Sequence, residues 1–119
     1  MQLFMNSFID RLRSCDPGKA VLREGNRFIT AGELYVDSHR LAVSMLHSGV
    51  RKGDRVLMAL PPGVEFLKII YANMMVGTVV SIIDPEMGRD NYQAKLKQFS
   101  PQHVFADSRL VFMNEHPLI

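Results

Sequence analysis

Residues 55–85 read RVLMALPPGVEFLKIIYANMMVGTVVSIIDP, and this stretch determines the expected class of fold. It holds two apolar runs, 55–60 and 79–83, with the length and composition of strands that are covered on both faces. Between them, residues 64–75 have the length of a helix and only two charged side chains. A strand, a helix and a strand joined by such short connections indicate a right-handed crossover between parallel strands.

The helix expected at 64–75 is apolar nearly all round, which is typical of a helix buried on more than one side. After the second strand, a further helix is expected at 91–100, with Tyr92, Leu96 and Phe99 along one stripe. Residues 103–106 read HVFA and predict a third strand, and residues 108–114 predict a short helix.

The N-terminal part has a different pattern. Residues 3–14 predict an amphipathic helix, and its apolar residues are Leu3, Phe4, Phe8, Ile9 and Leu12. Residues 20–24 and 27–30 predict the two strands of a β-hairpin, joined by a turn at Gly25 and Asn26.

Thr30 and Glu33 have the spacing of a capping box and predict the start of the next helix. Its apolar face comprises Leu34, Leu41, Ala42, Met45 and Leu46. Gly49 is placed to end this helix in a left-handed cap, with Val50 as the hydrophobic contact. The predicted fold is therefore α/β and three-layered, with a mostly parallel sheet and a β-hairpin near the N-terminus, in a single domain over residues 1–119.

Composition excludes several classes of protein. The 119 residues carry 14 Lys and Arg against 12 Asp and Glu, and this charge of +2 does not favour nucleic acid or an anionic membrane as partner. The single cysteine, Cys15, cannot form an intramolecular disulfide, so a reducing compartment is expected. The longest uncharged run, 69–83, is shorter than the roughly 20 residues of a membrane helix. With no signal-peptide pattern, the expected location is the cytoplasm.

Catalytic motifs are missing from the sequence: there is no Gly-rich phosphate loop, no GxSxG elbow and no HExxH. The four histidines are scattered, and they are His39, His47, His103 and His116. His39 and His47 lie two turns apart on one predicted helix, too far for one metal, so a solvated or partly buried role is favoured for these histidines.

Three other features have a structural and a functional interpretation. The methionines Met58, Met74 and Met75 fit core packing, with a lipid pocket as the alternative. Cys15 lies at the end of a helix, which raises a thiol pKa and disfavours a reactive thiol.

The third feature is a basic cluster near Tyr92, formed by Arg89, Lys95 and Lys97. It fits a solvated helix face, with phosphate binding as the alternative. None of these features points to a catalytic, cofactor-binding or metal-binding residue.

Five segments, in order, resemble the start of the AMP-forming ligase superfamily, which includes acyl-CoA synthetases and peptide-synthetase adenylation domains. They read FITAGEL (28–34), LHSGVRKGDRV (46–56), LPPGVEF (60–66), NMMVGTVVSIIDP (73–85) and HVFA (103–106). The resemblance covers residues 20–107. Within the superfamily, PPGVEF and DPEMGR are similar to the olefin β-lactone synthetases, with Glu86 where that subgroup has Gly.

This resemblance implies the N-terminal subdomain of an incomplete AMP-binding domain. The parent enzyme is expected to use ATP and Mg²⁺ to activate a fatty or β-hydroxy acid through an acyl-adenylate. The family's phosphate loop, ribose-binding Asp and catalytic Lys have no counterpart in this chain, so the segment alone is expected to be inactive and to hold no cofactor.

Two hypotheses about function follow. In the first, the chain is a structural part of such a ligase, its partner is the remainder of that enzyme, and the apolar helix 64–75 lacks its cover and promotes self-association. In the second, it is a stand-alone α/β interaction module derived from such an enzyme.

Overall fold

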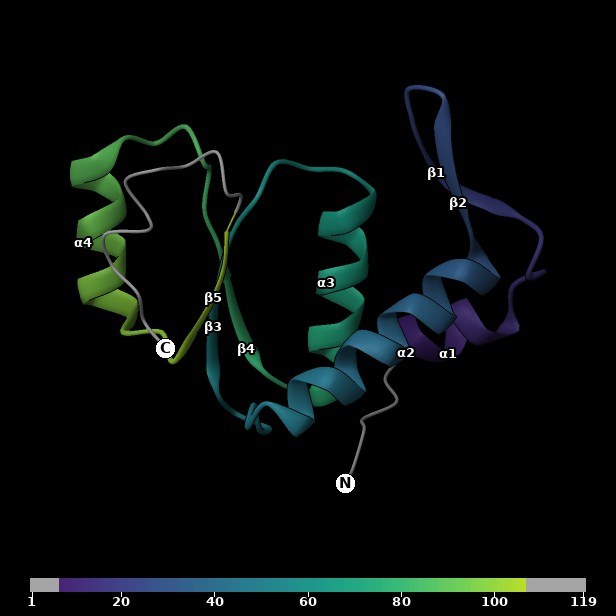
Figure 1. The fold of residues 1–119 in the computed structure, drawn as a ribbon, viewed down its shortest axis with the longest axis horizontal. Helices are drawn as coiled ribbons and strands as arrows, with labels where there is room; N and C mark the ends of the chain where they lie inside the picture. The colour runs from purple at the N-terminus through teal and green to yellow at the C-terminus, as the bar shows by residue number, and fades with distance from the viewer. Residues whose placement is uncertain (1–6, 107–119) are drawn as a thin grey trace. The chain divides into compact units, whose positions relative to one another are not determined.

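The structure is a computed structural model that describes residues 7–106 (Figure 1). Its elements are α1 (Ser7–Ser14), β1 (Ala20–Glu24), β2 (Arg27–Thr30), α2 (Ala31–His47), β3 (Arg55–Ala59), α3 (Val64–Val76), β4 (Val79–Ile82), α4 (Arg89–Phe99) and β5 (His103–Ala106). The chain divides into two compact units, and each is described by itself. The first contains Met1–Arg51 and Pro62–Gly77, and the second contains Lys52–Pro61 and Thr78–Ile119.

The first unit joins three helices and a hairpin. Strands β1 and β2 pair antiparallel, with Gly25 at a φ of 61° in the turn (Figure 1). Helix α1 buries Ile9 and Leu12 as predicted, but Phe8 is 60% exposed and does not belong to its buried face. The predicted start of this helix at residue 3 lies outside the described residues.

Helix α2 begins and ends where the sequence predicts. The Thr30 hydroxyl accepts a hydrogen bond from the Glu33 N–H at 3.2 Å, and the Glu33 carboxylate accepts one from the Thr30 N–H at 3.2 Å. At the other end, Gly49 has a φ of 102° and its N–H donates to Leu46. The Val50 N–H donates to the Met45 carbonyl at 3.0 Å, which completes a Schellman motif.

Helix α3 packs chiefly against α2. It ends at Gly77, whose φ of 87° is the left-handed conformation that glycine adopts without strain. Its apolar side chains are all buried or half-buried. Phe66, Leu67, Ile69 and Ile70 keep part of their surface exposed, so self-association through this helix stays a prediction.

The core of the first unit lies between the helices and the hairpin. Its buried residues are Leu12, Ile29, Ala31, Leu34 and Val64. They come from α1, β2, α2 and α3, so this cluster holds each of these elements to the others.

The second unit is a three-stranded parallel sheet with the strand order β4–β3–β5. Residues 56–59 of the central strand β3 are fully buried, as expected for a strand covered on both faces. Helix α4 contributes Tyr92 and Leu96 to a cluster with Leu57, Ala59 and Ile83. It starts two residues earlier than predicted, at Arg89.

Strand β4 differs from its prediction. The sequence predicts a strand covered on both faces, yet Val79 is 52% and Ile82 is 55% exposed. In the described part of the chain, β4 pairs only with β3 and so forms an edge of the sheet. An edge strand has a neighbouring strand on one side only, so fewer side chains flank its own on each face of the sheet. The fold class itself is confirmed, because the chain is α/β with a parallel sheet and an N-terminal hairpin.

Candidate functional site

The carboxyl ends of the parallel strands are the first place to search for a site, because ligands of open α/β sheets bind beyond these ends. The chain leaves β4 at Asp84, whose carboxylate accepts a hydrogen bond from the Glu86 N–H at 2.8 Å. The Asp84 carbonyl accepts another from the Met87 N–H at 3.1 Å. Asp84 thus holds the turn between β4 and α4, which is a structural role.

The amino ends of the strands are joined by a contact between a carboxylate and a histidine ring. Asp54 precedes β3 and His103 opens β5, and Nε2 of His103 lies 3.0 Å from Oδ2 of Asp54. Their side chains are only 18% and 20% exposed. The Asp54 carbonyl also accepts a hydrogen bond from the Val79 N–H of β4. Asp54 therefore connects all three strands at their amino ends. Open α/β sheets bind ligands at the other end, beyond the carboxyl ends of the strands.

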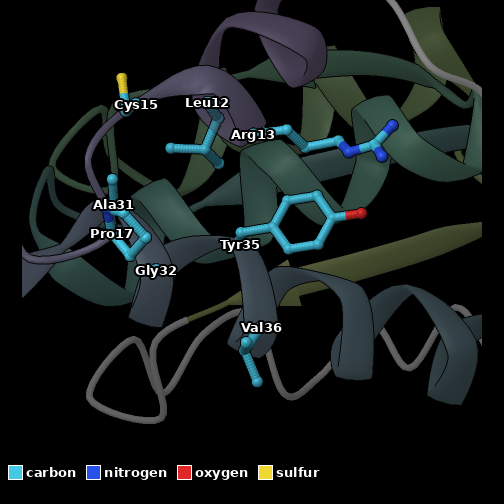
Figure 2. A pocket seen from close by; sticks show the side chains of 8 residues that line it. All are labelled: Leu12, Arg13, Cys15, Pro17, Ala31, Gly32, Tyr35 and Val36. Carbon is cyan, nitrogen blue, oxygen red and sulfur yellow. The ribbon is translucent and has the colours of Figure 1, made fainter.

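A hollow in the first unit lies between α1 and the start of α2 (Figure 2). Its volume is about 320 Å³, and its lining residues are Leu12, Arg13, Cys15, Pro17, Ala31, Gly32, Tyr35 and Val36. Cys15 is half-buried and is the only cysteine of the chain. The hollow is mostly apolar, and among its lining residues Arg13 and Tyr35 carry polar groups at the ends of their side chains.

His39 and His47 belong to no metal site within the described residues 7–106. His39 and His47 are both exposed, and the His39 ring stacks on Tyr35 with ring centroids 6.2 Å apart. Across residues 7–106, no group of three His, Cys, Asp or Glu side chains could hold a metal ion. His116 lies outside the described residues.

The surroundings of the methionines and of the basic cluster favour structural roles over ligand binding. Met58 and Met75 are fully buried and Met74 is half-buried, as in a packed core. The cations of the basic cluster are exposed, and they are Arg89, Lys95 and Lys97. Tyr92, however, is fully buried in the core of the second unit, where burial raises the pKa of its hydroxyl. The cluster therefore has no aromatic side chain at its surface, which favours a solvated helix face.

Charged side chains of the first unit form a network on its surface. The Arg27 guanidinium of β2 lies 2.8 Å from the Glu65 carboxylate of α3, and it holds the pKa of that carboxyl below its usual value. Lys68 lies 3.2 Å from Asp37 of α2 and 3.5 Å from Glu65. These side chains connect a strand and two helices, so the network has a structural role.

Sequence analysis missed two of these features. The Asp54–His103 pair joins residues 49 positions apart, and in the sequence Asp54 stands out only as part of the segment LHSGVRKGDRV. The start of β3 and of β5 in a parallel sheet would have been the signal for it. The hollow brings together two segments, 12–17 and 31–36, and nothing in their spacing predicts their contact.

Comparison with known families gives a clear result. The family described as "AMP-binding enzyme" matches residues 10–117. The chain belongs to this family. The resemblance stated from the sequence motifs is therefore confirmed.

Curated relatives in this family are much longer than the chain. Acetoacetyl-CoA synthetase of Danio rerio is 30% identical over 84 residues, which are 71% of this chain and 12% of the relative. The p-hydroxybenzoic acid–AMP ligase FadD22 of Mycobacterium tuberculosis is 26% identical over 82 residues, which are 69% of this chain and 12% of the relative. The chain thus spans about an eighth of the length of the curated relatives that it matches.

Solved structures share the fold. The o-succinylbenzoate coenzyme A synthetase MenE from Bacillus subtilis, in complex with ATP and a magnesium ion, has a TM-score of 0.80 and 19% identity. The match covers 88% of this chain and 29% of that chain. Among the described residues, no helix is long and apolar enough to cross a membrane.

Proposed function

We propose that residues 1–119 form the N-terminal structural part of an ATP-dependent, AMP-forming carboxylic-acid ligase. The observation that carries this proposal is the family match over residues 10–117. The chain covers 12% of its curated relatives, so we interpret it as one incomplete AMP-binding domain whose natural partner is the remainder of the enzyme.

In such a ligase, the substrate carboxylate attacks the α-phosphorus of ATP, and an acyl-adenylate and pyrophosphate are formed. The reaction needs cationic groups at the pyrophosphate and a positioned carboxylate. Within residues 7–106, the Asp84 carboxylate holds a turn and no acidic cluster could bind Mg²⁺. We therefore assign ATP, Mg²⁺ and catalysis to the remainder of the enzyme, and we expect the 119-residue chain alone to be inactive.

For the substrate, we propose a fatty or β-hydroxy acid. The similarity of PPGVEF (61–66) and DPEMGR (84–89) to the olefin β-lactone synthetases supports this choice. A second support is the name of a relative, acetoacetyl-CoA synthetase, because acetoacetate is a short acid that carries oxygen at the β-carbon. A β-hydroxy acid differs from it by two hydrogens at that position.

An exchange assay with the native gene product tests this proposal. Exchange of labelled pyrophosphate into ATP should depend on an added β-hydroxy or fatty acid, and benzoate and p-hydroxybenzoate should support less of it. Exchange that requires an aryl acid would contradict the substrate class. No exchange with any acid would contradict the ligase function.

The intact mass of the native product separates this proposal from its alternative. A mass several times 13.5 kDa supports the ligase part. A mass near 13.5 kDa would instead favour a stand-alone interaction module. Cell fractionation of the same material tests the proposed cytoplasmic location, for which the single cysteine argues.

The remainder of the enzyme would cover the exposed apolar residues of β4, Val79 and Ile82. An edge strand with exposed apolar side chains is a site of association with other chains. We therefore propose β4 as a second surface for self-association of the isolated chain, beside helix α3.

A further inference from the structure

The hollow between α1 and α2 has the size of a small-molecule site. Its volume of about 320 Å³ is roughly that of ten liquid water molecules. This is at the lower end of the range for ligand pockets, which are mostly apolar with a few polar groups. A molecule of six to ten non-hydrogen atoms is therefore the appropriate size of ligand.

The walls of the hollow are held in place by the fold. The Gly32 N–H donates a hydrogen bond to the Pro17 carbonyl at 3.0 Å, and the Ala31 N–H donates one to Lys19 at 2.8 Å. A Cβ at Gly32 would lie 3.1 Å from Pro17, so the two segments pack closely. Leu12 and Ala31 belong to the buried core of the first unit. The hollow is thus preformed by a capped helix and its hydrogen-bonded neighbour.

Arg13 makes the hollow more favourable for a negatively charged ligand than for a neutral one. In Figure 2, the side chains of Arg13 and Tyr35 run in the same direction, away from Pro17 and Ala31. Arg13 forms no ion pair with any residue in the range 7–106. The nearest acidic residues along the chain do not line the hollow, and Asp16 accepts a hydrogen bond from the Gly18 N–H. A ligand can therefore place a negative group against the guanidinium.

A carboxylate matches this arrangement better than a phosphate does. A guanidinium binds a carboxylate through two parallel hydrogen bonds, and a single positive charge balances its single negative charge. A phosphate has up to two charges and no apolar part for the side chains of Leu12 and Val36. In Figure 2, Leu12 lies between Cys15 and the Arg13 side chain, and the apolar body of a ligand would lie against Leu12.

We propose that this hollow binds a small carboxylate with an apolar body, with its carboxylate on Arg13 and its apolar part on Leu12, Pro17 and Val36. The proposal uses only residues 12–36 and does not depend on the ligase function. Exchange activity and binding here can therefore succeed or fail separately.

Cys15 provides a direct test, because it is the only thiol of the chain and lines the hollow. The rate of its alkylation by iodoacetamide is measured on the 119-residue chain with and without hexanoate or benzoate. Each variant is compared with itself, so that a change in the intrinsic reactivity of the thiol cancels. At millimolar concentrations, we expect either acid to slow alkylation at least fivefold, and the neutral hexanamide or benzamide to have less than a twofold effect.

Two substitutions and one control complete the design. Arg13→Gln should reduce the protection to less than twofold, whereas Arg11→Gln, on the same helix but outside the hollow, should leave it unchanged. Val36→Trp, which narrows the hollow, should also remove the protection. Equal protection by the amides, full protection in Arg13→Gln, or no protection in the parent chain would each overturn the proposal. Protection by inorganic phosphate as strong as by the acids would overturn the role of the apolar body.

Discussion

Hairpin β1–β2 and strand β4 both expose apolar side chains, but they do so in different surroundings. In the hairpin, Phe28 is 47% exposed, and the Arg23 guanidinium covers its ring at 5.5 Å from the centroid. Three of the nine strand residues of the hairpin are charged. Strand β4 reads VVSI and has no charged residue beside Val79 and Ile82.

Charges along an exposed strand prevent pairing with other chains, and an uncharged apolar edge promotes it. The hairpin is therefore a solvated surface that does not favour pairing with other chains. Strand β4 has the uncharged, apolar composition that is typical of a strand covered by other protein surface. The two regions expose apolar side chains to a similar extent but differ in the number of charged residues beside them. Substitutions in each region test whether this difference affects stability and association.

The largest loss of stability should come from substitutions at buried residues of the sheet and of the hairpin. Leu57 is fully buried at the centre of the sheet, and its replacement by Ala should lower the free energy of unfolding by about 2–5 kcal/mol. Ile29 on the inner face of the hairpin is the matched site, 2% exposed. Hydrogen exchange should show lost protection first in β3–β5 for Leu57→Ala and first in the hairpin for Ile29→Ala. The same pattern of loss in both variants would contradict the division into two units.

The next effect concerns association. Val79→Lys places a charge on β4 and should weaken self-association of the chain at least tenfold, or about 1.4 kcal/mol. Phe28→Lys in the hairpin is the control and should change association less than twofold. Sedimentation velocity over a range of concentrations measures both. Equal weakening by the two substitutions would show that β4 is not a special surface.

The same contrast explains what the sequence could and could not predict. The hairpin, the capping box of Thr30 and Glu33 and the end at Gly49 depend on neighbouring residues, and the structure confirms them within a residue or two. The exposure of Phe8 and Val79 depends on which distant elements cover them, and both predictions were wrong. For the candidate site, the hollow at Cys15 arises from segments brought together by the fold, and local patterns contain no signal for it. The Asp54–His103 pair follows only once β3 and β5 are placed side by side with their starts together, which no local pattern does.

Thr30 lies between the hairpin and α2, and its replacement tests how much the N-cap of α2 contributes to stability. Thr30→Ala removes the hydroxyl that accepts from the Glu33 N–H and should cost about 1 kcal/mol of stability. Thr30→Ser keeps the cap and should cost clearly less. Urea denaturation of the three proteins measures the differences. A loss as large in Thr30→Ser as in Thr30→Ala would mean that the cap contributes little.

The stability of the sheet should decrease at high pH, and the contribution of the hairpin's charges to stability should be lost at low pH. Burial raises the pKa of Tyr92 above its ordinary value of 10.0. The folded state thus keeps its proton longer than the unfolded state, and stability should be complete below about pH 10 and should fall as the pH rises further. Tyr92→Phe should flatten this alkaline decline in denaturation experiments from pH 8 to 11. A decline of unchanged slope would exclude Tyr92 as its cause.

The smallest effect should come from the charges of the hairpin. The hydrogen bond from Arg27 lowers the pKa of Glu65 below its ordinary value of 4.5. The unfolded state therefore takes up the proton first, so this contribution to stability is present above pH 4.5 and is lost as the pH falls through the folded pKa. The effect should be small, because the Glu65 side chain is 62% exposed and water screens the pair. Glu65→Gln should flatten the acid limb of the stability curve slightly at low salt, and 1 M NaCl should remove the difference between the two proteins. A difference that persists in 1 M salt would show that Glu65 acts through packing of its side chain and not through its charge.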